Sequence, residues 1–410
     1  MREYDLFAVT AHGLDSVCAA ELATLGIDGR RGTGGVAWRG TVRTMYRANL
    51  ELRTASRIVA RAGEFRARGF AELERHAARL PWRDVLRPGG SAVLRVTCRR
   101  SKLYHEGAVA ERVARVLADT VGVTTLAGRA LDDDVGSDAN ERRHDGRDGD
   151  GGQGEAHAQL IVVRFHRDVC TISMDSSGEL LHRRGYRQAV AKAPLRETIA
   201  AAMLLESGWH GESPLIDPFC GSGTIAIEAA LLARRIPPGL ANPLFVPRPF
   251  AFQQWPHFDA EAWQDVVAQA RAEVRDTRIA ITASDRDGGA VAAARANAAR
   301  AGVEHDIDFR RARLSELEPR SGFGHLVTNP PYGVRVGERR DLHALYTTLG
   351  RTVRERLPGW TVTLLSGDDA LAGATGLPLE ERLATRNGGI PVRLLSGRIA
   401  AGAHPAADAV

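Results

Sequence analysis

The stretch L-I-D-P-F-C-G-S-G-T-I-A-I-E-A-A-L-L-A (215–233) carries the strongest fold signal in the chain. It predicts a short apolar strand that passes through a glycine-containing turn directly into a helix. Gly221 and Gly223 allow the backbone to approach a ligand closely, and the start of the following helix offers N–H groups that lack intrahelical partners. A turn with a purely structural role is the alternative, because strand–turn–helix units are common.

Further strands are predicted downstream of this unit, each followed by a loop or a helix. They are I-A-I-T-A-S-D (279–285), H-L-V-T-N (325–329) and W-T-V-T-L-L-S (360–366), and a helix at 194–209 precedes the set. Strands that alternate with helices predict an α/β fold, with a mostly parallel sheet and helices on both faces.

Ligands of open α/β sheets bind at the carboxyl ends of the strands, and two acidic residues fall there. Asp217 ends the first strand, and Asp285 ends the second. An acid at the tip of the second strand is placed to accept the hydroxyl groups of a ribose. The next acid, Asp287, has a simpler interpretation as a helix cap. Nicotinamide-binding proteins share this layout, so these features alone leave the identity of the cofactor open.

The stretch T-N-P-P-Y-G (328–333) follows a third strand end and limits the chemistry further. Proline fixes φ and has no N–H, and Pro331 holds Pro330 in an extended conformation. The Pro330 carbonyl and the Asn329 amide oxygen are therefore two rigid acceptors, which suit an exocyclic amino group with two hydrogens to donate. Tyr332 is predicted to stack on the base that carries this group. The alternative is a proline-rich turn with a core tyrosine.

The first half of the chain predicts an α+β arrangement with a basic surface. Its predicted elements are a strand–turn–helix unit at 6–27, a strand at 36–40, a helix-to-strand passage at 50–65, helices at 71–82 and 107–122, and strands at 91–98, 158–165 and 168–175. Residues 30–115 contain 20 Lys and Arg against 7 Asp and Glu. Such a concentration favours a polyanionic partner. A solvated arginine-rich surface is the alternative, since only Lys102 and Lys192 of the 55 basic residues are lysine.

Three remaining features bear on class and location. Residues 132–155 hold 9 acidic and 3 basic side chains and almost no apolar ones, so 131–157 is predicted to be a disordered insertion. The four scattered cysteines predict reduced thiols and no metal site. No apolar run of about 18 residues predicts a membrane span, and the start M-R-E-Y-D-L-F-A-V-T does not resemble a signal peptide, so we expect a cytoplasmic protein.

These motifs resemble a known family. D-P-F-C-G-S-G-T, S-D-R-D and T-N-P-P-Y-G are similar to motifs I, II and IV of class I S-adenosylmethionine-dependent methyltransferases that act on amino groups of bases. Residues 173–209 resemble the linker and first helix of THUMP-containing RNA guanine-N2 methyltransferases. F-A-V-T-A-H-G-L-D-S-V-C near the start, V-T-C-R-R-S-K-L-Y-H in the middle and the closing N-G-G-I-P-V-R-L-L-S-G are also similar.

The resemblance implies a domain order and a set of site residues. The expected domains are a ferredoxin-like domain (1–65), a THUMP RNA-binding domain (66–175), a linker (176–193) and a Rossmann-like methyltransferase domain (194–410). The residues implied to bind S-adenosylmethionine are Asp217, Pro218, Gly221, Ser222, Gly223, Thr224 and Asp285. Those implied to hold the target guanine are Asn329, Pro330, Pro331 and Tyr332.

The resemblance also implies an activity: methyl transfer to the N2 amine of a guanosine in RNA. Within the group the likeness is greatest to the 23S rRNA enzymes, and at 410 residues the chain is expected to match only their first catalytic half. Transfer to tRNA, methylation of adenine N6 in DNA, and an RNA-binding assembly factor without activity are the alternatives. One departure is Arg313, which stands where the family usually has an aspartate facing the adenine. In the stretch F-R-R-A-R-L-S-E-L (309–317), Glu316 is the first acidic residue. The oligomeric state is left open.

Overall fold

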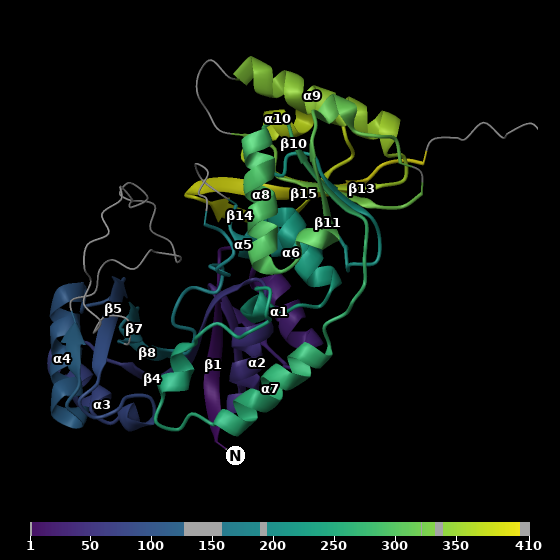
Figure 1. Cartoon of the computed structure of the whole chain (residues 1–410). Coiled ribbons are helices and arrows are strands. Elements are labelled where there is room, and N and C mark those ends of the chain that lie inside the picture. The colour runs from purple at the N-terminus through teal and green to yellow at the C-terminus, as the bar shows by residue number, and fades with distance from the viewer. Residues whose placement is uncertain (1, 127–157, 189–194, 321, 333–338, 402–410) are drawn as a thin grey trace, which may run out of the picture. The chain divides into compact units, whose positions relative to one another are not determined.

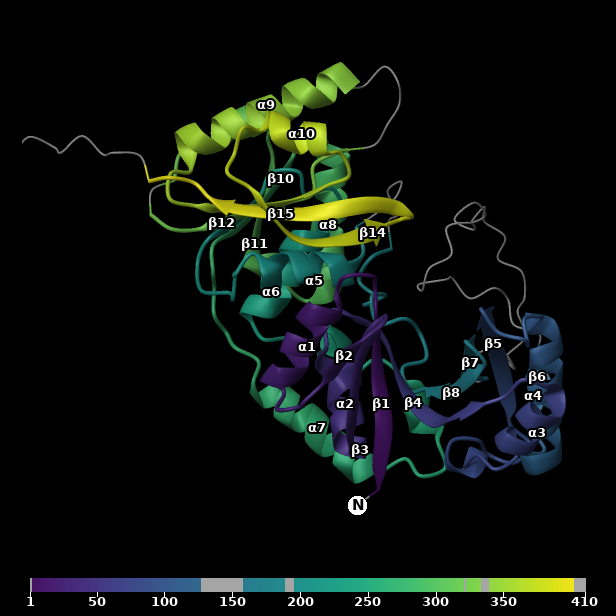
Figure 2. The same cartoon turned by 180° about the vertical axis from the view of Figure 1, so that it is seen from behind.

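The computed structural model describes residues 2–126, 158–188, 195–320, 322–332 and 339–401 (Figures 1 and 2). The insertion expected at 131–157 therefore lies outside the described residues. The chain divides into two compact units. Unit 1 comprises Met1–Ala11, Cys18–Leu181 and Pro247–Gln269, and unit 2 comprises His12–Val17, His182–Val246 and Ala270–Val410.

Unit 1 is built on one eight-stranded sheet in the order β2-β3-β1-β4-β8-β7-β5-β6. Its strands are β1 (Glu3–Thr10), β2 (Arg30–Gly32), β3 (Gly35–Thr41), β4 (Ala55–Arg66), β5 (Ser91–Arg99), β6 (Thr124–Leu126), β7 (Gln159–His166) and β8 (Val169–Asp175). The long strand β4 pairs with β1 along one edge and with β8 along the other. The segments expected as two domains, 1–65 and 66–175, thus contribute to one continuous sheet.

Four helices accompany this sheet: α1 (Asp15–Thr24), α2 (Val42–Glu51), α3 (Phe70–Ala77) and α4 (Glu106–Val121). The helix predicted at 107–122 corresponds to α4, which buries Val109, Val113 and Leu117 at helical spacing. Gly122, at φ 71°, ends this helix in the left-handed conformation that glycine adopts readily. The predicted strands 158–165 and 168–175 are the antiparallel pair β7 and β8.

Residues 247–269 belong to unit 1, although the expected catalytic range 194–410 includes them. They form a short 3₁₀ helix (Ala251–Gln254) and most of α7 (Ala260–Ala272). Phe252 stacks on Tyr46 of α2 with ring centroids 4.4 Å apart, and Trp263 meets both rings edge-on. The Trp255 indole N–H donates to Gln159 Oε1 at 2.8 Å. Aromatic packing therefore places this segment on the core of unit 1.

Unit 2 contains a seven-stranded sheet in the order β11-β10-β9-β12-β13-β15-β14. Its strands are β9 (Leu215–Asp217), β10 (Ile281–Asp285), β11 (Ile307–Arg311), β12 (His325–Thr328), β13 (Thr361–Ser366), β14 (Glu380–Asn387) and β15 (Ile390–Arg398). The first five are parallel, as predicted, whereas β15 pairs antiparallel with β13 and with β14. Because β9 lies between β10 and β12, the strand order reverses at its carboxyl end.

Helices cover both faces of this sheet (Figures 1 and 2). One face carries α5 (Glu197–Glu206), α6 (Thr224–Ala233) and α8 (Gly288–Ala301), and the other carries α9 (Arg339–Arg356) and α10 (Asp369–Ala374). The core on the α9 side joins Leu349 and Val353 of the helix to Leu326 and Val362 of the strands. The predicted Rossmann-like α/β arrangement is thereby confirmed for unit 2.

The structure also bears on membrane-spanning helices and on the cysteines. Within the described part of the chain, every helix is too short or too polar to cross a lipid bilayer. The four cysteines all lie in described segments, and none of them forms a disulfide.

Candidate active site at the carboxyl ends of β9, β10 and β12

The three predicted motifs meet at one edge of the unit 2 sheet. Asp217 ends β9, Asp285 ends β10, and Thr328 ends β12. The Thr328 hydroxyl donates to Asp217 Oδ1 at 2.7 Å, which ties the T-N-P-P-Y segment to the first motif. The Gly221 N–H donates to Asp285 Oδ2 at 3.0 Å, which ties the first motif to the second. Segments about 110 residues apart in sequence thus form one hydrogen-bonded site.

The glycine turn is held closely against α8. Gly221 and Gly223 have φ values of 51° and 85°, a region that strains residues with a Cβ. A Cβ on Gly223 would lie 2.9 Å from Ala294 Cβ on α8, whereas a Cβ on Gly221 would meet nothing within 4 Å. Gly223 therefore permits close helix packing, and Gly221 leaves open space beside the backbone.

The first turn of α6 keeps N–H groups available next to that space. Gly223 is the N-cap residue and, without a side chain, supplies no capping oxygen. Thr224, the first helical residue, is buried, and the Ser222 carbonyl accepts from Asn297 Nδ2 at 2.9 Å. The N–H groups at a helix start lack intrahelical acceptors and favour an anionic group such as a carboxylate.

Asp217 is an incompletely satisfied buried carboxyl group. Its side chain is buried, and Oδ1 accepts from the Thr328 hydroxyl and the Phe219 N–H. Oδ2 is buried and has no hydrogen-bond partner among the described residues. Burial, reinforced by the nearby Asp285 carboxylate, raises the pKa of Asp217 to about 7. A cation bound beside Oδ2 would favour the charged form.

Asp285 organises the loops around it. One carboxylate oxygen accepts from the Gly221 N–H, and the other accepts from the Asp287 N–H at 3.0 Å. Each carboxylate oxygen has a second lone pair, so both retain capacity for a ligand hydroxyl. Asp287 Oδ1 accepts from the Gly289 N–H at 2.8 Å and caps α8, which confirms the simpler interpretation of that residue.

The acceptors predicted after β12 are present and unpaired within the described chain. Asn329 Oδ1 is buried and has no donor there. The Pro330 carbonyl likewise takes part in no hydrogen bond of the described residues. Pro330 is buried and Pro331 is exposed. A buried acceptor without a donor costs free energy unless a ligand or water supplies one.

Tyr332 is held by residues at the end of β14 and directly after β13. Its hydroxyl accepts from Asn387 Nδ2, at the end of β14, at 3.0 Å. The ring lies so close to the backbone after β13 that a Cβ on Gly367 would be 2.9 Å from Tyr332 Cδ2. Burial raises the pKa of Tyr332, so the phenol stays neutral in the physiological range. The aromatic ring is thus held in one orientation.

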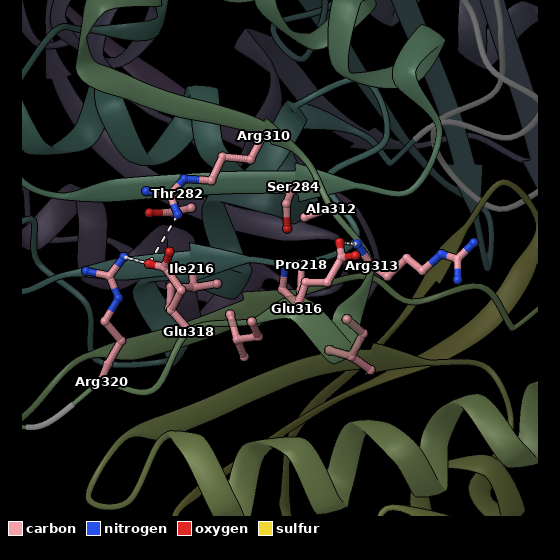
Figure 3. A pocket seen from close by; sticks show the side chains of 12 residues that line it. Ile216, Pro218, Thr282, Ser284, Arg310, Ala312, Arg313, Glu316, Glu318 and Arg320 are labelled. Carbon is pink, nitrogen blue, oxygen red and sulfur yellow. Dashed lines mark hydrogen bonds and ion pairs between the residues drawn. The ribbon is translucent and has the colours of Figure 1, made fainter.

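A small pocket adjoins the site under the loop that follows β11 (Figure 3). Of the residues predicted to bind the cofactor, Pro218 lines it; Ser284 and Ala312 lie beside Pro218. The Arg313 side chain extends away from the pocket. The backbone N–H of Arg313 donates to Glu316 Oε2 at 2.7 Å. The carboxylate of Glu316 therefore lies beside the backbone of Arg313, the position at which the resemblance places an aspartate.

Several residues that shape the site were not singled out from the sequence. Asn297 holds the glycine turn, Asn387 orients Tyr332, and Glu316 folds back onto Arg313. In the sequence, Asn297 is marked only as an amide within an alanine-rich helix. Its burial is a property of the folded chain. The partners of Asn387 and Glu316 depend on contacts between distant segments or on a loop conformation that no sequence pattern specified.

Together the strand order, the glycine turn and the acidic strand ends define a Rossmann-like methyltransferase site. Residues 184–395 match the UPF0020 family, described as an RMKL-like methyltransferase domain, and residues 5–59 match the RlmL ferredoxin-like domain. The chain belongs to this methyltransferase family, and its cofactor is S-adenosyl-L-methionine. A group of three or more metal-ligating side chains is not found within the described ranges.

Individual relatives support this membership. The chain is 34% identical to a putative RNA methyltransferase of Synechocystis over 95% of both chains. It is 34% identical to ribosomal RNA large subunit methyltransferase K/L of Syntrophotalea carbinolica, over 98% of this chain but 55% of that protein's length. The crystal structure of a putative methyltransferase complexed with SAH aligns with a TM-score of 0.81 and 28% identity, over 98% of this chain and 99% of the other.

Proposed function

We propose that this protein transfers the methyl group of S-adenosylmethionine to the exocyclic N2 amine of a guanosine in RNA, and that large-subunit ribosomal RNA is its substrate. The observation that carries the proposal is the unpaired pair of acceptors after β12, Asn329 Oδ1 and the Pro330 carbonyl. They adjoin the cofactor motif through the Thr328–Asp217 hydrogen bond. An exocyclic amine has two hydrogens to satisfy them.

The residues of the first two motifs fit the cofactor. S-adenosylmethionine supplies a methyl carbon that its sulfonium makes electrophilic. The first N–H groups of α6 are suited to a carboxylate, and the unpaired Oδ2 of Asp217 is suited to a cationic group. The free lone pairs of Asp285 are suited to ribose hydroxyls. Glu316 Oε2, at the Arg313 N–H, is suited to an amino group of the adenine.

The acceptor residues would act on the base by orientation and electrostatics. An exocyclic amine is a poor nucleophile because its lone pair is delocalised into the ring. When Asn329 and Pro330 hold both hydrogens, the nitrogen can become tetrahedral and direct its lone pair at the methyl carbon. The two oxygens would also stabilise the positive charge that the nitrogen acquires on methylation, and one N–H proton would then pass to solvent.

Two observations support RNA as the substrate class. Both relatives at 34% identity are named as RNA methyltransferases, and one is named for large-subunit ribosomal RNA. Residues 30–115, which fold within unit 1, carry 20 basic against 7 acidic side chains. Such a surface binds nucleic acid largely through the phosphate backbone. The segment 66–175, expected to be a THUMP domain, is proposed to supply most of these contacts.

Nucleoside mass spectrometry of RNA from a deletion strain tests the proposal. Total RNA is separated by size before digestion, and loss of N2-methylguanosine from the large ribosomal RNA alone is the expected result. Loss from tRNA alone would move the substrate to tRNA, and loss of N6-methyladenine from DNA would replace the proposed acceptor. Purified protein with radiolabelled cofactor should then restore the methyl group to RNA from that strain. Cofactor binding without transfer to any RNA would contradict an enzymatic role.

A further inference from the structure

Three loops of unit 1 converge at one end of its sheet, where β4, β5 and β7 finish. They are the loops 66–69, 99–105 and 166–168. Among the exposed side chains they present are five cationic residues and one aromatic residue, here called the basic edge: Arg66, Arg68, Arg100, Lys102, Tyr104 and Arg167. Tyr104 is 78% exposed, although its neighbour Leu103 is buried and anchors the loop.

One residue joins these three loops. Asp168 Oδ1 accepts from the Lys102 N–H at 2.8 Å, and Oδ2 accepts from Arg68 Nε at 3.1 Å. The Asp168 N–H donates to the Ser101 hydroxyl at 3.0 Å, and its carbonyl accepts from the Ala67 N–H at 3.0 Å. The hydrogen bond from the Lys102 N–H is the main cause that lowers the pKa of Asp168, so this carboxylate stays ionised.

The backbone at this edge turns tightly. Arg100, Arg167 and Asp168 have φ values of 51°, 51° and 63°, which side chains other than glycine rarely adopt. Arg167 and Asp168 form the two-residue turn between β7 and β8, where a positive φ is the usual hairpin geometry. The Asp168 contacts to the neighbouring loops hold these loops in place before any partner binds.

From these observations, and resting on the proposed function, we propose that the basic edge binds a single-stranded segment of the RNA substrate, with the cations on phosphates and Tyr104 stacked on an unpaired base. An exposed aromatic ring among cations matches a strand whose bases are free to stack. An A-form duplex presents phosphates but keeps its base faces covered. An acidic protein or an anionic membrane would also attract the cations, but neither offers an unpaired base on which the ring can stack.

Binding and transfer by the full chain test this proposal. Fluorescence anisotropy is measured with a labelled single strand of about 12 nucleotides and with a duplex of the same length. Tyr104→Ala should raise the Kd for the single strand about 5- to 100-fold, and Tyr104→Phe should restore most of the affinity. Because Tyr104 is exposed, neither variant should change folding. A Kd for Tyr104→Ala within about twofold of the parent, or preference of the parent for the duplex, would overturn the proposal.

A pair of double variants controls for total charge. Arg100→Glu with Lys102→Glu changes the basic edge, whereas Arg79→Glu with Arg83→Glu makes the same charge change beyond the other end of α3. The edge pair should reduce the dependence of log Kd on log salt by roughly 1.4 for single-stranded RNA, and the control pair should change it far less. Equal effects of the two pairs would show that net charge, not the edge, binds the strand.

Lysine chemistry provides an independent readout, since Lys102 and Lys192 are the only lysines in the sequence. Bound single-stranded RNA should protect Lys102 from amine acetylation, as read by mass spectrometry of a single peptide. An unprotected Lys102 in the saturated complex would contradict the proposal. Transfer assays separate this inference from the proposed function: the edge variants should raise the KM for RNA and leave cofactor affinity unchanged. Parent protein that binds RNA at the edge but methylates none would refute the enzymatic proposal only.

Discussion

At the residue scale, the site depends on polar atoms that the described chain leaves unpaired. Asn329 Oδ1 and Asp217 Oδ2 are both buried without partners, and each lies at the end of a neighbouring strand. Buried polar atoms without partners are rare in folded proteins because each costs about 1 to 3 kcal/mol. Ten more such atoms occur elsewhere in the described chain, but these two lie at the ends of neighbouring strands beside the glycine turn, as expected of a ligand site.

Asn329→Ala removes one of the two proposed acceptors for the target amine. We expect the transfer rate at saturating RNA to fall roughly 100-fold or more, because the lost oxygen stabilises charge that develops only during transfer. Cofactor affinity, measured by calorimetry, should stay within a few-fold. Asn329→Asp keeps an oxygen acceptor and should retain more activity than the alanine variant. Unchanged transfer by Asn329→Ala would remove this side chain from the mechanism.

Asp217→Asn tests the raised pKa of this buried carboxyl group. Because the folded pKa of about 7 exceeds the usual 3.8, protonation stabilises the fold; that stabilisation is complete below about pH 4 and is lost as pH rises through 7. Without cofactor, the stability of the asparagine variant relative to the parent should therefore increase by roughly 2 to 4 kcal/mol between about pH 5 and pH 8. Chemical denaturation at several pH values measures it.

The matched control for this change is Asp276→Asn, which alters an exposed carboxylate. Its stability relative to the parent should be nearly independent of pH over the same interval. If the stability of Asp217→Asn relative to the parent is also independent of pH, the pKa of the buried carboxyl group is not raised in solution, and the group has a partner there.

At the element scale, short stretches of sequence predicted most of the helices and strands. The apolar runs before Asp217, Asp285 and Asn329 are strands, and the alanine-rich segment after Asp287 is a helix. These predictions held because hydrophobic periodicity and turn residues act locally. Pairings of side chains between elements, such as Asn297 with the Ser222 carbonyl or Asn387 with Tyr332, left no comparable local signal.

Gly223→Ala tests the contact between α6 and α8. The substitution adds a Cβ at φ 85° that would lie 2.9 Å from Ala294 Cβ and 3.2 Å from its Cα, so either helix must shift. We expect a loss of about 2 to 4 kcal/mol in unfolding free energy and weaker cofactor binding, since the start of α6 moves. Urea denaturation and calorimetry measure the two effects.

Gly208→Ala separates backbone strain from packing in this comparison. Gly208 has φ 75°, and a Cβ added there would meet no atom within 4 Å, so only the strain of the left-handed conformation is added. A loss of about 1 kcal/mol is expected. Equal losses of unfolding free energy in Gly223→Ala and Gly208→Ala would show that the close approach of α6 and α8 does not affect stability.

At the scale of the whole molecule, each of the two compact units is assembled from segments that are far apart in the sequence. The range 194–410 was expected to form a single methyltransferase domain, but 247–269 belongs to unit 1. The ranges 1–65 and 66–175 share one sheet through β4. The aromatic residues of 247–269 stand out in the sequence, but their partner Tyr46 lies about 200 residues earlier, so no local pattern could identify it.

Phe252→Ala should therefore weaken unit 1 more than unit 2, although its position in the sequence falls between motifs of unit 2. Phe252 is fully buried against Tyr46 and Trp263. Removing a buried aromatic ring costs about 3 to 5 kcal/mol. Hydrogen exchange followed by mass spectrometry should show faster exchange in peptides of β1, β3 and α2, with little change in β9 and β10.

Phe323→Ala provides the matched control, because this phenylalanine of unit 2 is half exposed. It should leave exchange in unit 1 unchanged and cost far less stability. Loss of protection in the unit 2 strands on Phe252→Ala, with the unit 1 strands unaffected, would contradict the packing described for 247–269.

Hydrophobic periodicity, turn chemistry and the residues at strand ends were sufficient to predict a mostly parallel α/β fold and to select Asp217, Asp285 and Asn329. These features are encoded within a few consecutive residues, because dihedral preferences and amphipathic spacing are local. The methyltransferase class came from the resemblance of the motifs to a known family. The shared sheet of unit 1, the packing of 247–269 and the return of Glu316 to Arg313 required the folded chain. Each depends on contacts whose free energy appears only after distant segments, or a whole loop, have been brought together.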